Sequence, residues 1–385
     1  MNTNLKRILR RLLVSGFLAL TVAMAGCNVL PERALSGPAS EVPDKGFRSR
    51  PRVRYGSYAT ANFGTTFLDS RMGRHGYSWP FFEKNGIAYT RRGGHIDVIH
   101  LRIAIDWTAY LTAKSYGHLM GGEPGFSTKL SVDRSRNYVG ISYPPGWDTL
   151  PEEDRSIIAR EVAFAMGPYL AFTMVTWHEI LTWYGFKCMG LPVEFASAFS
   201  WEDSYSNLLG TIVAVKALQD TEHAYNKAVE IALKEEMEKL GIQPARVARQ
   251  ASASVRGDWY TGGLPLFVDM KKRNFDIGLD DGYITPTLVP DVPGCEGAEP
   301  LSYPVPTLDA LHKYGFSLTV EIEPHEWESH KILRTVHEDG HEKRVNPEQH
   351  FSRIMDHILR QAADKYGPEY EPEGEDDPQY VSTGE

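Results

Sequence analysis

The sequence predicts a mainly α protein with a small β element (α+β), in which an irregular helical core surrounds a kinked central buried helix. Three observations support this fold class. Apolar residues recur at helical spacing through the middle of the chain, residues 162–177 carry no charge, and strand-like patterns are short. A helix that is apolar on every side lies inside a domain, so we expect helices to form the core.

Composition divides the chain into five parts. We expect a lipoprotein-type signal peptide at residues 1–26, a tether at 27–54, a mainly helical core domain at 55–257, a mixed β/α part packed on the core at 258–366, and an acidic disordered tail at 367–385. The tether is rich in proline, serine and charge, and the tail holds seven acids and no basic residue. Both compositions are typical of solvated segments.

The core begins with a short strand and a long helix. Residues 86–90 form an apolar run between turn-like segments, which predicts a strand. Apolar side chains at helical spacing then predict a helix over residues 95–115; they are Ile96, Ile99, Ile103, Trp107 and Tyr110.

A second long helix is expected over residues 148–185. A capping threonine, an early proline and two acids mark its first turn. Proline removes one backbone donor, which predicts a kink at Gly167 and Pro168 in the middle of the helix. The uncharged stretch is too short to span a membrane and is bounded by Glu161 and His178, so we expect a buried core helix.

Shorter elements follow this helix. The patterns predict helices over residues 200–218, 222–240 and 347–366, the first of them opened by a capping box. Residues 315–323 alternate as a strand does, and residues 283–289 are its expected partner. This β element and the last helix should pack on the helical core.

The N-terminus resembles a bacterial lipoprotein signal. Four basic residues precede an apolar stretch that ends in Met24-Ala25-Gly26-Cys27, a lipobox-like sequence. The resemblance implies lipidation of Cys27 and, because Asn28 follows, sorting to the outer membrane. We therefore expect a cell-envelope protein at the outer membrane that faces the periplasm or the cell surface. The alternative is a secretory signal with an incidental cysteine.

The charge balance excludes one class of partner. The formal net charge is −9, and removal of a signal with four basic and no acidic residues leaves the mature chain at −13. A nucleic acid is therefore not an expected partner, whereas the membrane is one through the lipid anchor. Cys188 and Cys295 are the other two cysteines, and the sequence does not show whether they meet in space.

His178 and Glu179 form the first candidate site. They lie side by side between tryptophans near the end of a buried helix, where ionisable groups need a partner. His-Glu on a helix resembles the start of a zinc-protease motif, but Thr182 occupies the position of the second histidine. A protease of that kind is therefore not predicted.

Asp97 and His100 are candidates for the missing ligands. They are three residues apart, so they share one helix face and can hold one ion. If their helix converges with the helix of His178, the three side chains would bind zinc or another divalent metal. Glu179 would then be the general base for a metal-bound water.

Each of these residues also has a structural explanation. Asp97 in a first helical turn can serve as a cap, and His100 can be a core histidine bonded to a carbonyl. Glu179 can pair with an arginine such as Arg102 or Arg256, as buried carboxylates often do.

Other histidines carry weaker predictions. His75 and His95 lie in glycine-rich loops, where histidines are frequently exposed. His337 and His341 have the spacing of a zinc helix, but Gly340 between them favours a turn.

Four segments of the core carry a resemblance to a known family. They are HIDVIH at 95–100, DWTAYL at 106–111, WHE at 177–179 with WYG at 183–185, and SAFS at 197–200 with YSNLLG at 205–210. These segments resemble a family of bacterial lipoproteins known as domain of unknown function 4056, over about residues 55–366. The resemblance implies no activity.

The sequence leaves two functions open. The first is a lipid-anchored envelope protein that acts as a metal-dependent hydrolase, with Asp97, His100 and His178 as ligands and Glu179 as base. The alternative is a non-catalytic envelope protein that binds a glycan, a lipid or a protein partner. Convergence of His100 and His178 in an open cleft would favour the enzyme, whereas an interior network closed by arginine would favour the alternative.

Overall fold

The computed structural model of the chain describes residues 50–54, 66–77, 83–186, 197–262, 269–337 and 341–372. The chain separates into two compact units, Met1–Glu32 and Arg33–Glu385, and every described residue belongs to the second. The expected signal peptide, the expected lipidation site Cys27, and Cys188 lie outside the described residues.

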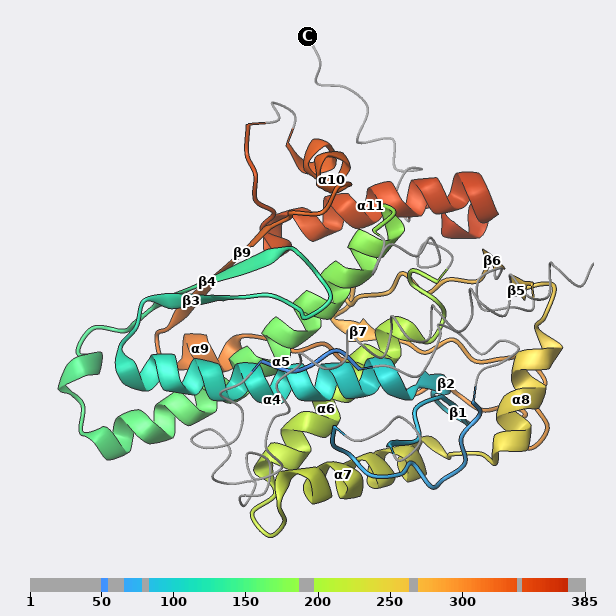
Figure 1. Cartoon of the computed structure of the whole chain (residues 1–385), viewed down its shortest axis with the longest axis horizontal. Coiled ribbons are helices and arrows are strands. Elements are labelled where there is room, and N and C mark those ends of the chain that lie inside the picture. Colours follow the sequence, from blue (N-terminus) through green and yellow to red (C-terminus); the bar gives the residue numbers. More distant parts are fainter. Residues whose placement is uncertain are drawn as a thin grey trace, which may run out of the picture. The chain divides into compact units, whose positions relative to one another are not determined.

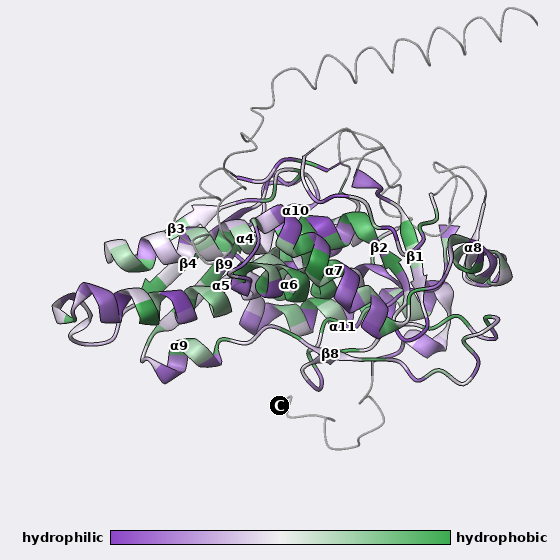
Figure 2. Cartoon of the chain, turned by 90° about the horizontal axis from the view of Figure 1, so that it is seen from below, coloured by the Kyte–Doolittle hydropathy of each residue, from purple (hydrophilic) through white to green (hydrophobic). Residues whose placement is uncertain are grey.

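Three long helices form the core, as Figure 1 shows: α4 (Val98–Gly121), α5 (Glu152–Trp183) and α6 (Asp203–Gln219). Helix α4 packs on both α5 and α6. Figure 2 shows α6 as largely hydrophobic, because most of its side chains are buried against its neighbours. The predicted fold class, mainly α with a small β element, is confirmed.

Helix α5 runs through Gly167 and Pro168 without ending. Among the described helices, α5 is the one that is long and apolar enough to cross a membrane. Of its most apolar stretch of 18 residues, however, 61% is buried within the protein. The burial comes from α4, which contacts α5 from Ser156 through Gly167 to Glu179, and from α6. This packing agrees with the expected core helix.

A short hairpin precedes α4. Strand β1 (Ile87–Thr90) confirms the predicted strand, and it pairs antiparallel with β2 (Gly94–Asp97). Helix α4 therefore begins three residues later than the expected residue 95, because the backbone of residues 94–97 bonds to β1. Asp97 is the residue at which the chain changes from strand to helix.

A three-stranded antiparallel sheet lies beside α4, in the order β3 (Gly125–Thr128), β4 (Arg136–Ser142) and β9 (Ser317–Glu323). Strand β9 confirms the predicted strand at 315–323. Its expected partner at 283–289 is wrong, because β9 pairs with β4 in the register Val139↔Val320.

Strand β4 alternates between buried and more exposed residues. Asn137, Val139 and Ile141 are buried, and the residues between them are not. Tyr283–Ile284 forms β7 instead and pairs with β8 (Tyr303–Pro304).

Smaller elements complete the fold. They are η4 (Trp147–Thr149), α7 (Tyr225–Leu240), α8 (Ala245–Ser254), β5 (Tyr260–Thr261), β6 (Asp269–Met270), α9 (Asp309–Lys313), α10 (Ser329–Val336), α11 (Pro347–Tyr366) and η7 (Pro368–Tyr370). Helix α11 has the predicted bounds, because the side chain of Asn346 caps it and a proline occupies its first turn.

The C-terminal part packs around the last turns of α5. Trp177 and Trp183 belong to an apolar cluster with residues of β9, α10 and α11. The chain remains ordered beyond the expected start of the tail at residue 367, since Tyr370 is buried and its hydroxyl accepts a hydrogen bond from the backbone of Arg273. The rest of the tail, residues 373–385, lies outside the described residues.

Candidate metal centre

Asp97 occupies the junction of β2 and α4. Its Oδ1 accepts a hydrogen bond from the backbone of Ile99 at 2.8 Å, and its own backbone amide donates to the hydroxyl of Ser206 on α6 at 2.9 Å. The predicted cap role of Asp97 is therefore confirmed for one carboxylate oxygen. The other oxygen, Oδ2, lies 3.0 Å from Nδ1 of His100 in the first turn of α4.

His100 lies among carboxylates from the β2–α4 junction, from α5 and from α6. Besides Asp97, its Nδ1 is 3.5 Å from Oδ1 of Asp203 at the start of α6, and its Nε2 is 3.6 Å from Oε1 of Glu179 on α5. The side chains of Asp97, Asp203 and Glu179 are 0%, 2% and 5% exposed, whereas that of His100 is 21% exposed. The imidazole is thus the part of the cluster that solvent can reach.

Asp203 and Glu179 are anchored through one oxygen each. Oδ2 of Asp203 accepts the backbone amide of Ser200 at 3.0 Å, and Oε2 of Glu179 accepts that of Phe199 at 2.9 Å. Both remaining oxygens face His100. One short turn before α6 therefore fixes two of the carboxylates.

Burial changes the protonation of this cluster. Loss of solvent raises the pKa of Asp203 well above its usual value and raises that of Glu202, the preceding residue, to about 7. Burial alone would lower the pKa of His100, but the carboxylates of Asp203 and Asp97 raise it well above 6.5. Burial alone would raise the pKa of Glu179, but the bond to His100 lowers it.

The cluster therefore contains more acid than one imidazolium can neutralise. In the described residues, the ion pairs of Glu179 and Asp203 all run to His100. A buried excess of carboxylates requires either bound protons or a bound cation, because isolated buried charge is costly. A cation fits the polar atoms here: Nδ1 of His100 and Oδ1 of Asp203 are buried, and the contacts of Nδ1 with Oδ1 of Asp203 and Oδ2 of Asp97 have ion-pair distances without the geometry of a hydrogen bond.

Asp97, His100 and Asp203 have the geometry of a metal site. Each offers one ligand atom, and these atoms all lie within 4.8 Å of one another. In a tetrahedral zinc site with bonds of about 2.0 Å, neighbouring ligand atoms stand about 3.3 Å apart. The distances of 3.0 Å and 3.5 Å from His100 Nδ1 to the two carboxylates lie on either side of that value. The described part of the chain thus holds an Asp–His–Asp group that can bind a metal ion.

The structure brings together three of the four residues expected at the site. Asp97 and His100 lie in the cluster and Glu179 lies beside it, whereas His178 is replaced by Asp203. Asp203 and Glu202 look in the sequence like acids that suit a helix start, which hides their second use. Two acids at the start of a helix whose first turn is buried were the signal that could have identified this site.

His178 makes a different contact. Its Nδ1 lies 2.7 Å from Oδ1 of Asp133, a buried residue between β3 and β4, and its ring meets Phe186 edge-on. The charge of His178 still acts on Glu179 and lowers the pKa of that carboxyl. His178 therefore lies near the cluster but turns its Nδ1 toward the sheet. The metal and catalytic roles of all these residues stay predictions.

Neither arginine expected for Glu179 reaches it. Arg102 donates to Oδ1 of Asn85 at 2.6 Å and to the backbone of Met72 at 2.8 Å. Arg256 donates to the backbone of Gly262 at 3.0 Å. Among the described residues, Glu179 therefore does not belong to an interior network closed by arginine.

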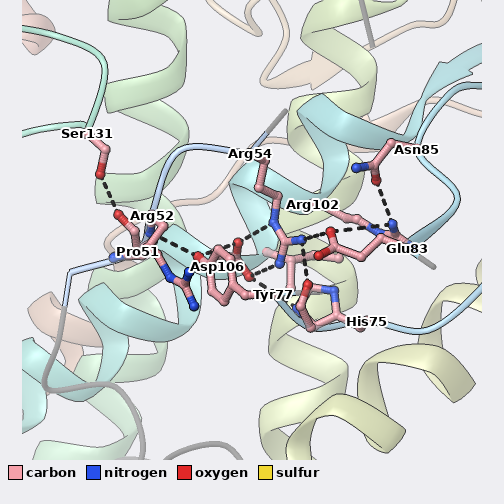
Figure 3. A network of polar contacts seen from close by, with 12 residues as sticks. Pro51, Arg52, Arg54, His75, Tyr77, Glu83, Asn85, Arg102, Asp106 and Ser131 are labelled. Carbon is pink, nitrogen blue, oxygen red and sulfur yellow. Dashed lines mark hydrogen bonds and ion pairs between the residues drawn. The ribbon is translucent and has the colours of Figure 1, made fainter. Parts of the chain in front are cut away.

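Such a network does exist further along α4 (Figure 3). Arg54 binds both oxygens of Asp106, with Nε 2.5 Å from Oδ2 and Nη2 3.0 Å from Oδ1, and also pairs with Glu83. Tyr77 donates its hydroxyl to Asp106 at 2.9 Å and lies under the Arg54 guanidinium. Although burial alone would raise the pKa of Asp106, Arg54 and His75 lower it. This network fixes the N-terminal segment on α4.

His75 and His95 are buried, contrary to the expected exposure. His75 Nε2 lies 3.1 Å from Asp106, and loss of solvent lowers its pKa to about 4. Trp201 donates to Nδ1 of His95 at 3.2 Å, so Nε2 carries the proton and donates to the backbone of Ala248 at 3.3 Å. Burial lowers the pKa of His95 to about 4 as well. Both are neutral core residues.

Two other predictions concern the C-terminal part. His337 is the residue at which α10 ends, and His341 follows beyond residues that are not described, so no described helix places the two on one face. Cys295 is buried and free, and its pairing with Cys188 lies outside the described residues.

The fold and the site together define a mainly helical protein with a buried Asp–His–Asp group that can hold a metal ion. Residues 65–287 match the family described as protein of unknown function DUF4056, and the chain belongs to this family. The three members of the group all lie within the matched residues. No curated protein and no solved structure matches the chain significantly.

Proposed function

We propose that this chain is a lipid-anchored envelope protein whose helical core binds a divalent cation through Asp97, His100 and Asp203, and that its chemistry is hydrolysis. The observation that carries the proposal is the position of His100 Nδ1, buried between two carboxylate oxygens at 3.0 Å and 3.5 Å. Zinc suits the imidazole and manganese suits the carboxylates, so these two metals are the first to test.

Glu179 would orient the histidine ligand. If Nδ1 of His100 binds a cation, Nε2 carries the ring proton. Oε1 of Glu179 lies 3.6 Å from Nε2 and would accept this proton in a hydrogen bond if the two side chains moved slightly closer. Its other oxygen already holds the backbone of Phe199. Both oxygens are thus in use, which argues for a positioning role and against the general-base role expected from the sequence.

Hydrolysis is the chemistry that such a site would supply. A cation held by Asp97, His100 and Asp203 would leave room for a water molecule and would make its proton easier to remove. His178 is the base that we propose in place of Glu179, because its charge acts on the Glu179 carboxyl and Asp133 orients its ring through Nδ1 at 2.7 Å. Access to the site would come from the side of His100, its most exposed member.

Metal content tests the binding part of the proposal. Purified protein dialysed against zinc or manganese should retain about one ion per chain by mass spectrometry. His100→Ala and Asp203→Asn should lose it, and the unaltered protein should gain thermal stability with the metal while the variants do not. His223→Ala is a matched control, because His223 also lies three residues from an aspartate, Asp220, at 2.9 Å on the surface. Absence of bound metal in the unaltered protein, with no thermal shift, would overturn the proposal.

Two further experiments test the hydrolytic part and the anchor. A panel of ester and phosphoester substrates should show turnover that needs the metal and falls in His178→Ala; turnover that survives loss of the metal would contradict the mechanism. The lipobox-like residues support the anchor, and metabolic labelling with a fatty acid should mark the unaltered chain but not Cys27→Ser. Equal labelling of both would remove Cys27 as the acylated residue.

A further inference from the structure

A second polar feature lies away from the metal centre, where the three-stranded sheet meets α4. A pocket of about 240 Å³ is lined by Arg50, Tyr110, Ser127, Thr128, Lys129 and Arg136. Three of these side chains are cations, three carry hydroxyl groups, and none is an acid. Tyr110 follows His100 on α4 by ten residues, which places it roughly 15 Å further along the helix axis. The pocket is therefore separate from the metal centre.

The sheet builds one wall of this pocket. Ser127 and Thr128 end β3, Lys129 follows them, and Arg136 begins β4, which pairs with β3. Helix α4 builds the opposite wall, where Lys114 donates from Nζ to the backbone of Ser127 at 3.2 Å. Figure 1 shows β3 and β4 alongside this part of α4.

Arg50 closes the rim. The next residue, Pro51, is buried, and its carbonyl accepts a hydrogen bond from the hydroxyl of Ser131. That contact holds the end of the N-terminal segment against the β3–β4 connection. The charge of Arg50 acts on the Tyr110 hydroxyl, which lies across the pocket.

The three cations lie outside every ion pair of the described residues, and Arg136 acts on the Glu323 carboxylate through its charge alone. In the described residues, Arg50, Lys129 and Arg136 take part in no ion pair, although ion pairs are common elsewhere in the chain. Glu323 lies opposite Arg136 in the sheet, but its carboxylate accepts from Tyr138 at 2.8 Å and lies 3.7 Å from His325. Three like charges that converge on one hollow repel one another unless an anion lies between them.

We infer that this pocket binds a phosphate group, either as free phosphate or as the head group of a phospholipid. Arginine side chains offer a planar pair of donors that matches two phosphate oxygens, and the hydroxyls of Ser127 and Thr128 can donate to the others. The lipid source rests on the proposed anchor. The 23 residues from Cys27 to Arg50 reach at most roughly 80 Å, so the pocket can lie at a membrane surface.

A net charge of −13 makes the test sharp, because the mature chain as a whole is repelled by phosphate and by anionic lipid. Binding must then come from a local site. The full mature chain with Cys27→Ser, which carries no acyl group, is titrated with inorganic phosphate by calorimetry. It is also sedimented with vesicles of phosphatidylcholine, with and without phosphatidylglycerol.

The pocket variant is Lys129→Gln with Arg136→Gln. Its matched control is Lys227→Gln with Lys234→Gln, which removes two exposed cations from α7. We expect the pocket variant to weaken binding by about tenfold or more, since charged hydrogen bonds are lost, while the control binds as the parent does. Melting temperatures close to that of the parent show that both variants are folded.

The two sources give different results. Phosphate binding without vesicle binding supports free phosphate as the ligand, and vesicle binding that needs phosphatidylglycerol supports the lipid head group. The inference is overturned if the parent binds neither probe, or if the pocket variant and the control bind equally well.

Discussion

His100 and Asp203 lie on different helices, yet Nδ1 of His100 is 3.5 Å from Oδ1 of Asp203. The contact depends on how closely α4 and α6 approach. At Gly210 on α6 a Cβ atom would stand 2.3 Å from the backbone oxygen of Leu101, the residue after His100, and 2.7 Å from Cβ of Ala104. The absence of a side chain at Gly210 therefore positions the two halves of the candidate metal centre.

Gly210→Ala should destabilise the protein and weaken the site together. The new methyl group must push α6 away from backbone atoms of α4, which costs about 1–3 kcal/mol in the free energy of unfolding. The same shift separates Asp203 from His100. Urea denaturation and zinc titration measure the two effects.

Gly117→Ala provides the control on α4, because a Cβ there meets nothing within 4 Å. It should raise the free energy of unfolding by about 0.5–1 kcal/mol through helix propensity alone. A Gly210→Ala protein that matches the Gly117→Ala protein in both measurements would show that the close approach is unimportant.

Glu179→Gln and His178→Ala, changes at adjacent residues, should affect zinc binding differently. Loss of the carboxylate that orients His100 should weaken the affinity for zinc about 10–100-fold. Losses of this size are usual when a residue that orients a metal ligand is replaced. His178→Ala should leave affinity within about threefold, because Nδ1 of His178 pairs with Asp133 and not with the cluster. Competition with a fluorescent zinc chelator measures both. The opposite order would make His178 a ligand and replace Asp203 in the proposed set.

Arg54→Ala should be among the most damaging substitutions in the N-terminal segment. It leaves the buried carboxylates of Asp106 and Glu83 without their main partner, which costs about 3–5 kcal/mol. Arg52→Ala is the matched control. The guanidinium carbon of Arg52 lies 4.8 Å from the centre of the same Tyr77 ring, and Arg52 forms no ion pair with a described residue. Its cost should stay below about 1 kcal/mol. Equal midpoints in urea for the two variants would contradict the role given to Arg54.

The neutral His95 should make stability fall with acid. Its pKa is lowered from 6.5 to about 4 in the folded protein, so between these values the unfolded chain takes up a proton that the folded chain does not. The contribution of His95 is therefore complete above pH 6.5 and is lost as the pH falls toward 4, by at most roughly 3 kcal/mol. His95→Gln should flatten the dependence of the unfolding free energy on pH in this window. An unchanged slope would show that His95 is protonated in the fold.

Local patterns were enough to predict most of the helices. The charge-free stretch of α5 and the apolar periodicity of α4 and α11 reflect which side of each helix is buried, and that information lies within the element itself. Pairing of β9 with β4 was not predicted, because the two strands are distant in the chain and many short segments share their alternation.

For the candidate site, the sequence by itself determined that Asp97 and His100, three residues apart, lie close together and that Glu179 is buried near the end of an apolar helix. Only the tertiary structure decided that Asp203 joins them and that His178 turns to Asp133. Successive residues of a helix point about 100° apart, so His178 and Glu179 face different surroundings. Which of the two meets the cluster depends on how α5 is rotated against α4 and α6, and packing between helices sets that rotation.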